Sequence, residues 1–109
     1  MSNKWTIEYF PEAIEDINHL DGSVKSQVVK AIDKISGNPL PQNEGGYGKP
    51  LGNKTGLNLT GLLKVKLKQT GIRIVYYLVK NEEKMKVVIV GMRADNNVYK
   101  QAAARINKQ

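Results

Sequence analysis

Basic side chains recur at every second position of an apolar stretch in the C-terminal half of the chain. Lys64, Lys66 and Lys68 alternate with apolar residues, and the stretch contains no acidic residue. Arg73 follows after a short break, and Arg93 ends the next apolar run. Because alternate side chains of a strand point to one face, these cations are expected together on one side of a small sheet. Such a cluster would bind a phosphodiester, which points to RNA.

The strand register decides which cations meet. Gln69-Thr70-Gly71 is a hairpin signal. A two-residue turn at Thr70-Gly71 predicts three cross-strand pairs: Lys68 with Arg73, Lys66 with Val75, and Lys64 with Tyr77. Arg93 joins the same side only if the next loop leaves an odd number of unpaired residues, or if a bulge shifts the register. Like charges opposite each other destabilise a sheet, and such conflict is expected at functional sites. The alternative is a solvated face where lysine opposes aggregation, above all at Lys68.

Composition narrows the classes of protein. The 109 residues predict a single domain, and the net charge of +7 favours an anionic partner, with a merely basic domain as the alternative. The chain has no cysteine and one histidine, so we expect no disulfide, no metal centre and no cofactor. No apolar run is long enough for a membrane span, and the N-terminus lacks the order of a signal peptide. A cytoplasmic protein is expected.

Hydrophobic periodicity predicts an α+β domain. The expected order is strand, helical hairpin, three-strand antiparallel meander and C-terminal helix, with the helices on one face of the sheet. The corresponding segments are a strand at 4–9, a helix at 11–20, a helix with its apolar stripe at 24–35, strands at 62–68, 72–79 and 85–92, and a helix after Asn96-Asn97. In the last helix Tyr99 shares the stripe of Ala102, Ala103 and Ile106, where a core position is the more frequent outcome.

Residues 38–61 hold three prolines and six glycines and predict a long irregular loop. Lys49 and Lys54 could contact phosphates from this loop, although a plain connection is the simpler interpretation.

Three segments together resemble the RelE branch of the RelE/ParE toxins, the toxin halves of bacterial type II toxin–antitoxin modules. They are Leu63-Lys-Val-Lys-Leu-Lys-Gln-Thr-Gly-Ile-Arg-Ile-Val-Tyr, Val90-Gly-Met-Arg and Asn97-Val-Tyr. The resemblance covers residues 1–109 nearly throughout, including Ile7-Glu-Tyr-Phe-Pro and Lys49-Pro-Leu-Gly. It implies a RelE-like fold and a metal-independent endoribonuclease that cleaves mRNA in the ribosomal A site. It also implies a cognate antitoxin, typically acidic, that masks the site.

The resemblance places the family's catalytic residues on five positions: Lys64, Lys66, Arg73, Arg93 and Tyr99. The family often has arginine after the leucine of its loop motif, where this chain has Gly52 after Leu51. Lys49 or Lys54 could replace that phosphate contact, and Lys68 could add another.

The implied reaction is attack of a ribose 2′-OH on the adjacent phosphate, which leaves a 2′,3′-cyclic phosphate and a 5′-OH. Lys66 is the candidate base, because neighbouring positive charges favour its neutral form. Arg73 would hold the phosphate through its planar guanidinium, and Arg93 would act at the leaving oxygen. Tyr99 would stack on or orient the nucleotide, and Lys64 would hold the backbone.

Two other functions stay open at this point. A ParE-like toxin that inhibits DNA gyrase would share the fold but generally lacks the full cationic set. A non-enzymatic basic RNA-binding domain would have the same residues dispersed rather than convergent.

Overall fold

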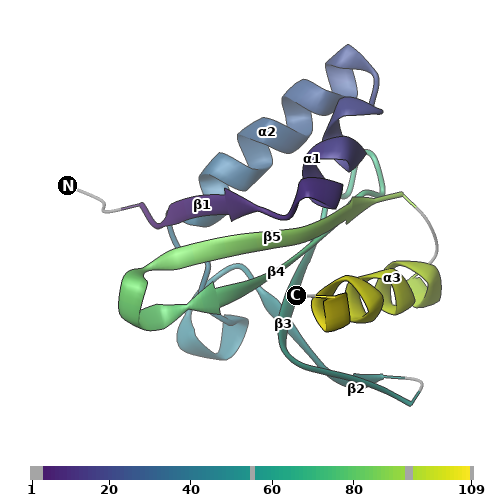
Figure 1. The fold of residues 1–109 in the computed structure, drawn as a ribbon. Helices are drawn as coiled ribbons and strands as arrows, with labels where there is room; N and C mark the ends of the chain where they lie inside the picture. Colours follow the sequence, from purple (N-terminus) through teal and green to yellow (C-terminus); the bar gives the residue numbers. More distant parts are fainter. Residues whose placement is uncertain (1–3, 55, 93–94, 109) are drawn as a thin grey trace.

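The computed structural model describes residues 4–54, 56–92 and 95–108. One five-stranded sheet organises the chain, with strands in the order β1-β5-β4-β3-β2 (Figure 1). The helices and strands, in chain order, are β1 (Thr6–Tyr9), α1 (Pro11–Asn18), α2 (Gly22–Ser36), β2 (Lys49–Lys54), β3 (Leu57–Lys66), β4 (Arg73–Val79), β5 (Lys84–Gly91) and α3 (Asp95–Lys108), with short 3₁₀ turns at Gln42–Glu44 and Lys80–Glu82. β1 pairs with β5 in parallel, and all other pairs are antiparallel. The predicted α+β fold class is confirmed.

The helices lie on both faces of the sheet, so the expectation of one covered face is wrong. α2 lies on one face and α3 on the other (Figure 1). The physical reason is visible in β4, where Ile74, Val75 and Tyr76 are consecutive and buried. Successive strand residues point to opposite faces, so a continuous apolar run requires cover on both sides.

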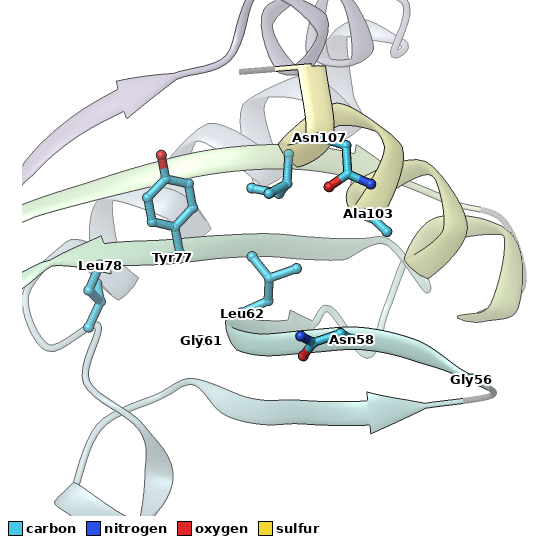
Figure 2. Close-up of a pocket in the computed structure, with 9 residues that line it drawn as sticks. Gly56, Asn58, Gly61, Leu62, Tyr77, Leu78, Ala103 and Asn107 are labelled. Atoms are coloured by element: carbon cyan, nitrogen blue, oxygen red, sulfur yellow. The ribbon is translucent and has the colours of Figure 1, made fainter.

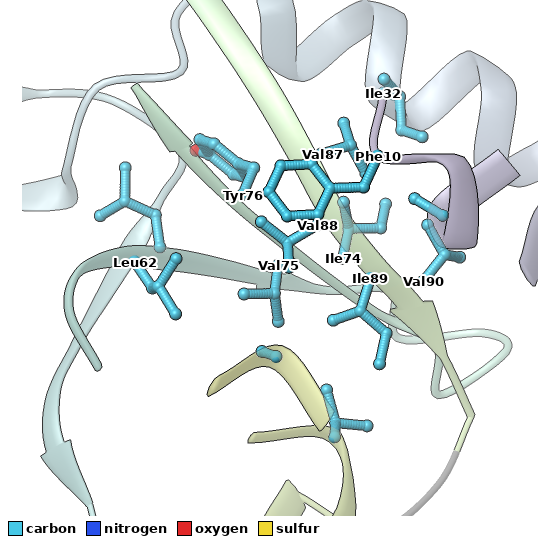
Figure 3. Packing of buried hydrophobic residues seen from close by; sticks show 14 of the residues in the cluster. Phe10, Ile32, Leu62, Ile74, Val75, Tyr76, Val87, Val88, Ile89 and Val90 are labelled. Carbon is cyan, nitrogen blue, oxygen red and sulfur yellow. The ribbon is translucent and has the colours of Figure 1, made fainter. Parts of the chain in front are cut away.

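The core fills both sides of the central strands β4 and β5. In Figure 3 Ile32 of α2 lies on one side of the sheet, while Val75 and Ile89 point towards α3. A register shift lies between Val75 and Tyr76, which pair with Ile89 and Val87. Val88 therefore has no strand partner and forms a β-bulge.

β2 was not predicted, since its segment was assigned to the irregular loop. Its residues Lys49–Lys54 pair with β3. β3 begins at Leu57, eleven residues before Lys68. Pro50 is tolerated because β2 is an edge strand, and Gly52 takes a left-handed φ of 60° beside a register shift. Proline and glycine hide the pairing in the sequence.

Within the described ranges, no helix combines the length and apolar character needed to cross a bilayer.

Candidate active site

The β3–β4 hairpin brings the predicted cations together in a register two residues away from the expected one. Lys66 pairs with Arg73 and Lys64 with Val75. The turn is longer than two residues, because the Gly71 N–H donates to the Leu67 carbonyl at 2.8 Å and the Leu67 N–H donates to the Ile72 carbonyl at 2.8 Å. A shift of two residues preserves the face of each side chain, so Lys64, Lys66 and Arg73 still share one face.

Lys68 leaves this group. It lies in the turn and lines a hollow with residues of α2, among them Lys30 and Lys34. The predicted pair of Lys68 with Arg73 is therefore wrong, and like charges meet instead at Lys66 and Arg73.

Lys49 is the loop residue that joins the cations. It lies directly opposite Lys64 across the β2–β3 pair. Lys54 ends β2 opposite Leu57, and its side chain lies outside the described residues. It lies five positions after Lys49, a distance of about 16 Å at 3.3 Å per residue. The cationic cluster of this sheet consists of Lys49, Lys64, Lys66 and Arg73.

Arg73 and Lys64 are both half-buried and held by neighbours. The Arg73 Nη1 donates to the Gly71 carbonyl at 3.0 Å, which places the guanidinium beside the turn. The Lys64 ammonium lies over the Tyr99 ring, 5.7 Å from its centroid. A cation over an aromatic face is attracted by the ring quadrupole, so Tyr99 helps to position Lys64.

Tyr99 is a core residue in this structure, as the helical stripe allowed. Its exposed fraction is 3%, too small for its ring to stack on a nucleotide in this conformation. Its hydroxyl is buried without a hydrogen-bond partner among the described residues. The structure thus shows contact of Tyr99 with a predicted catalytic lysine rather than an open stacking surface.

Arg93 lies outside the described residues. The bulge that would place it on the side of Arg73 is present at Val88, and β5 ends with Gly91 opposite Arg73. Its position at the cluster stays a prediction.

Two hollows border the sheet near these residues. One of about 310 Å³ is lined by the loop residues Gln42 and Tyr47 and by Lys49, Lys64, Val65 and Lys66. A larger one of about 580 Å³ lies between α3 and the sheet, lined among others by Leu62, Tyr77 and Ala103 (Figure 2). The larger hollow contains none of the cationic cluster, so size alone does not identify the site of phosphate chemistry.

α3 is fixed to the rest of the domain by an ion pair that the sequence did not indicate. Arg105 contacts Asp16 of α1 through Nη1 at 2.7 Å and Nη2 at 3.2 Å. Arg105 also donates to the Val88 carbonyl at 2.8 Å, and the Val90 N–H donates to Asp16 at 3.1 Å. The helix that carries Tyr99 is therefore held against α1 and the β5 bulge.

Because its side chains are ammonium and guanidinium groups, the cationic cluster suits stabilisation of negative charge on a phosphate rather than the binding of a metal ion. It offers three ammonium groups and one guanidinium along neighbouring strands. In the described part of the chain, no group of three or more His, Cys, Asp or Glu side chains is placed to hold a metal ion.

A comparison of sequences finds one similar curated protein over almost the whole chain. A putative RelE-like toxin protein of Escherichia coli is 25% identical over 107 residues, which are 94% of this chain and 98% of that protein. No protein-family model matches the chain.

Solved structures of RelE toxins share the fold. A free E. coli RelE mutant superposes with a TM-score of 0.73 at 21% identity, covering 95% of this chain and 99% of that one. The toxin chain of the RelBE2 toxin–antitoxin complex of Mycobacterium tuberculosis gives 0.68 at 22% identity, covering 87% and 98%. In the intact E. coli RelBE toxin–antitoxin complex the values are 0.62 at 20% identity, covering 83% and 98%.

The architecture is that of the RelE toxins. The resemblance to the RelE toxin family that the sequence indicated is thereby confirmed.

Proposed function

We propose that this chain is the toxin of a type II toxin–antitoxin module and a ribosome-dependent endoribonuclease. The observation that carries the proposal is the convergence of Lys49, Lys64, Lys66 and Arg73 on one face of adjacent strands. Like charges so placed oppose folding, and the arrangement is useful where a polyanion binds. The RelE fold and the matching residue types support the same function.

In the proposed reaction a ribose 2′-OH attacks its own 3′-phosphate. The O2′–P bond forms, the P–O5′ bond breaks, and the products are a 2′,3′-cyclic phosphate and a 5′-OH. Lys66, exposed at the end of β3, is the proposed acceptor of the 2′-OH proton. Arg73 and Lys64 stabilise the charge that develops on the phosphoryl oxygens. By the resemblance, Arg93 donates a hydrogen bond to the leaving O5′, which becomes the 5′-OH by taking up a proton equivalent to the one lost from the 2′-OH.

Dependence on the ribosome follows from the weakness of these acid–base groups. A cluster of lysine and arginine gains most when another body positions the substrate, because orientation converts a bimolecular step into a unimolecular one. The charge of +7 favours docking to ribosomal RNA and makes it salt-dependent. The site of action would be the cytoplasm, and no cofactor or metal takes part in the proposed reaction.

The partner in this proposal is a cognate antitoxin. The relatives solved as toxin–antitoxin complexes support it. An acidic chain over the cationic cluster would neutralise it and block access of mRNA.

Mapping of mRNA 5′ ends after induced expression tests the function. Cuts that recur at one phase within codons are expected for the wild type. Arg73→Ala should abolish them, and Lys30→Ala, which removes a cation from α2 on the other face, should not. Cleavage by Arg73→Ala at the wild-type rate would refute the site assignment. DNA damage without mRNA cleavage would support a ParE-like gyrase inhibitor instead.

A further inference from the structure

We propose that the hollow bordered by Gln42, Tyr47, Lys49, Lys64, Val65 and Lys66 is a subsite for the RNA nucleotide next to the scissile phosphate, with the Tyr47 ring as the platform for its base. This inference rests on the proposed function, since it assigns a second nucleotide of the same substrate. Its volume of about 310 Å³ lies at the lower end of ligand pockets, which suits a single nucleotide rather than a larger ligand.

Tyr47 is an exposed aromatic ring on a loop with a fixed shape. Tyr47 belongs to no helix or strand, and its exposed fraction is 44%. Its N–H donates to the Asn38 carbonyl at 3.1 Å, and the next residue, Gly48, donates to the Leu40 carbonyl at 3.1 Å. The Gln42 N–H donates to the Gly48 carbonyl at 2.7 Å, which closes the loop. The backbone of the loop that carries the ring is therefore fixed before any ligand arrives.

The packing beneath the loop permits no side chain at two glycines. A Cβ on Gly46 would lie 2.0 Å from the Leu40 carbonyl oxygen, and one on Gly48 would lie 2.5 Å from the Tyr76 hydroxyl. That buried hydroxyl donates to the Pro39 carbonyl at 2.9 Å, so β4 anchors the base of the loop. A loop anchored in this way is suited to preorganised recognition, because little ordering entropy is lost on binding.

Charges around Tyr47 favour an anionic, aromatic ligand. The Lys34 ammonium lies 5.6 Å from the ring centroid and so stabilises the ring's orientation. Three lysines border the hollow, and none of the described residues that line it carries a carboxylate. The acid of the adjacent 3₁₀ turn, Glu44, pairs with Lys80 at 3.6 Å instead.

The combination of a tyrosine ring with lysines matches how proteins bind single-stranded RNA. Unstacked bases stack on aromatic side chains, and lysines follow the backbone. Lys64 and Lys66 border this hollow and also belong to the cationic cluster, so a nucleotide here is adjacent to a phosphate held by them. Lys49 is placed to contact the neighbouring phosphate, and the Gln42 amide could contact the base edge.

The test uses ribosomes programmed with mRNA whose A-site codon carries 2′-O-methyl riboses, which block attack, and 2-aminopurine at one position at a time. Base stacking quenches the fluorescence of 2-aminopurine. We expect wild-type toxin to quench it at one position, Tyr47→Phe to preserve the quenching, and Tyr47→Ala to abolish it. Absence of quenching by the wild type at every position would overturn the proposal.

Single-turnover cleavage of unmodified mRNA measures how much Tyr47 contributes to binding. Loss of one stacked base costs about 1–3 kcal/mol, so Tyr47→Ala should raise the half-saturating toxin concentration roughly 5- to 150-fold. Lys49→Ala should lower the salt dependence of binding by about one phosphate contact, whereas the control Lys30→Ala should leave it unchanged. If Tyr47→Ala fails to fold in thermal melts, Tyr47→Leu removes the ring and keeps an apolar side chain.

The outcomes separate the two proposals. Codon-phased cleavage by wild type that Tyr47→Ala and Tyr47→Leu leave unchanged overturns the subsite alone. Tyr47-dependent quenching without cleavage of unmodified mRNA supports the subsite and refutes the nuclease. Unchanged RNA measurements with weaker antitoxin binding by Tyr47→Ala would make the hollow a protein interface and overturn the subsite.

Discussion

The ion pair between Arg105 and Asp16 should be one of the strongest single contributions to the stability of this domain. Its geometry is bidentate, with N–O distances of 2.7 and 3.2 Å, and the two side chains are only 14% and 21% exposed. Removal of one partner from a buried pair costs about 3–5 kcal/mol, because the other charge is left without compensation. Since water reaches both groups in part, we expect Asp16→Ala to lower the free energy of unfolding by about 2–4 kcal/mol.

A double-mutant cycle separates the pair from its other contacts. Asp16→Ala also loses the bond from the Val90 N–H, and Arg105→Ala also loses the bond to the Val88 carbonyl. The coupling between the two substitutions excludes both of these losses, and we expect it to be about 1.5–3 kcal/mol. Equilibrium urea unfolding followed by circular dichroism measures all four proteins, with Lys4→Ala as the control, because Lys4 and Asp33 form an exposed pair. That control should cost less than about 1 kcal/mol.

The same substitution should reach the site through α3. Arg105 and Tyr99 are on the same helix, α3. If α3 is held less firmly, the Tyr99 ring moves away from Lys64. We expect Asp16→Ala to reduce the proposed mRNA cleavage under conditions where the protein is still folded. A coupling below about 0.5 kcal/mol would show the two charges to be energetically independent and would refute this reasoning.

Three further substitutions test contacts that stabilise the loop and the sheet. Gly46→Ala should distort the loop under Tyr47, because its Cβ would meet the Leu40 carbonyl at 2.0 Å; weaker RNA binding is expected, whereas Gly22→Ala, with open space around it, should bind normally. Tyr76→Phe should lower the free energy of unfolding by about 1–2 kcal/mol, since the Pro39 carbonyl loses its donor. Burial raises the pKa of Tyr76, so wild-type stability from this group is present below pH ~10 and lost above it, and the phenylalanine variant should lack that loss in thermal melts. The hydrogen bond from Lys84 lowers the pKa of Glu8, so the contribution of Glu8 to stability is present above the usual carboxylate range and is lost as pH falls. Glu8→Gln should therefore make Tm depend less on pH on the acid side. An unchanged dependence of Tm on pH would contradict this.

Strong hydrophobic periodicity made most of the helices and strands predictable. The turn length, the edge strand β2 and the Asp16–Arg105 pair have no such periodicity and were not predicted. The alternation of Lys64 and Lys66 with apolar residues gave the correct face, because strand geometry fixes it. The register required the turn length, and the glycine at position 71, with φ of 75°, allowed a longer turn than the sequence signal suggested. Pro50 and Gly52 concealed an edge strand. Asp16 and Arg105 carry no local pattern, since their pairing depends on how α1 and α3 meet.

Tyr47 was missed for a related reason. Its neighbours are glycines, and no periodic segment surrounds it. No pattern in the sequence therefore indicated that the loop would hold the ring beside the lysines of β3. Tyr99, by contrast, was placed correctly by its helical stripe, and its burial followed from that stripe.

The parallel pairing of β1 with β5 has a consequence for synthesis of the chain. The β3–β4 hairpin closes between neighbouring segments, but β1 must wait for β5, and Asp16 must wait for a partner 89 positions later. Closing so long a loop is entropically costly, and nonlocal contacts form late in folding. The lysines of the hairpin therefore leave the ribosome well before β5 and α3 have packed around them. A nascent copy would therefore complete the site only after α3 has been synthesised.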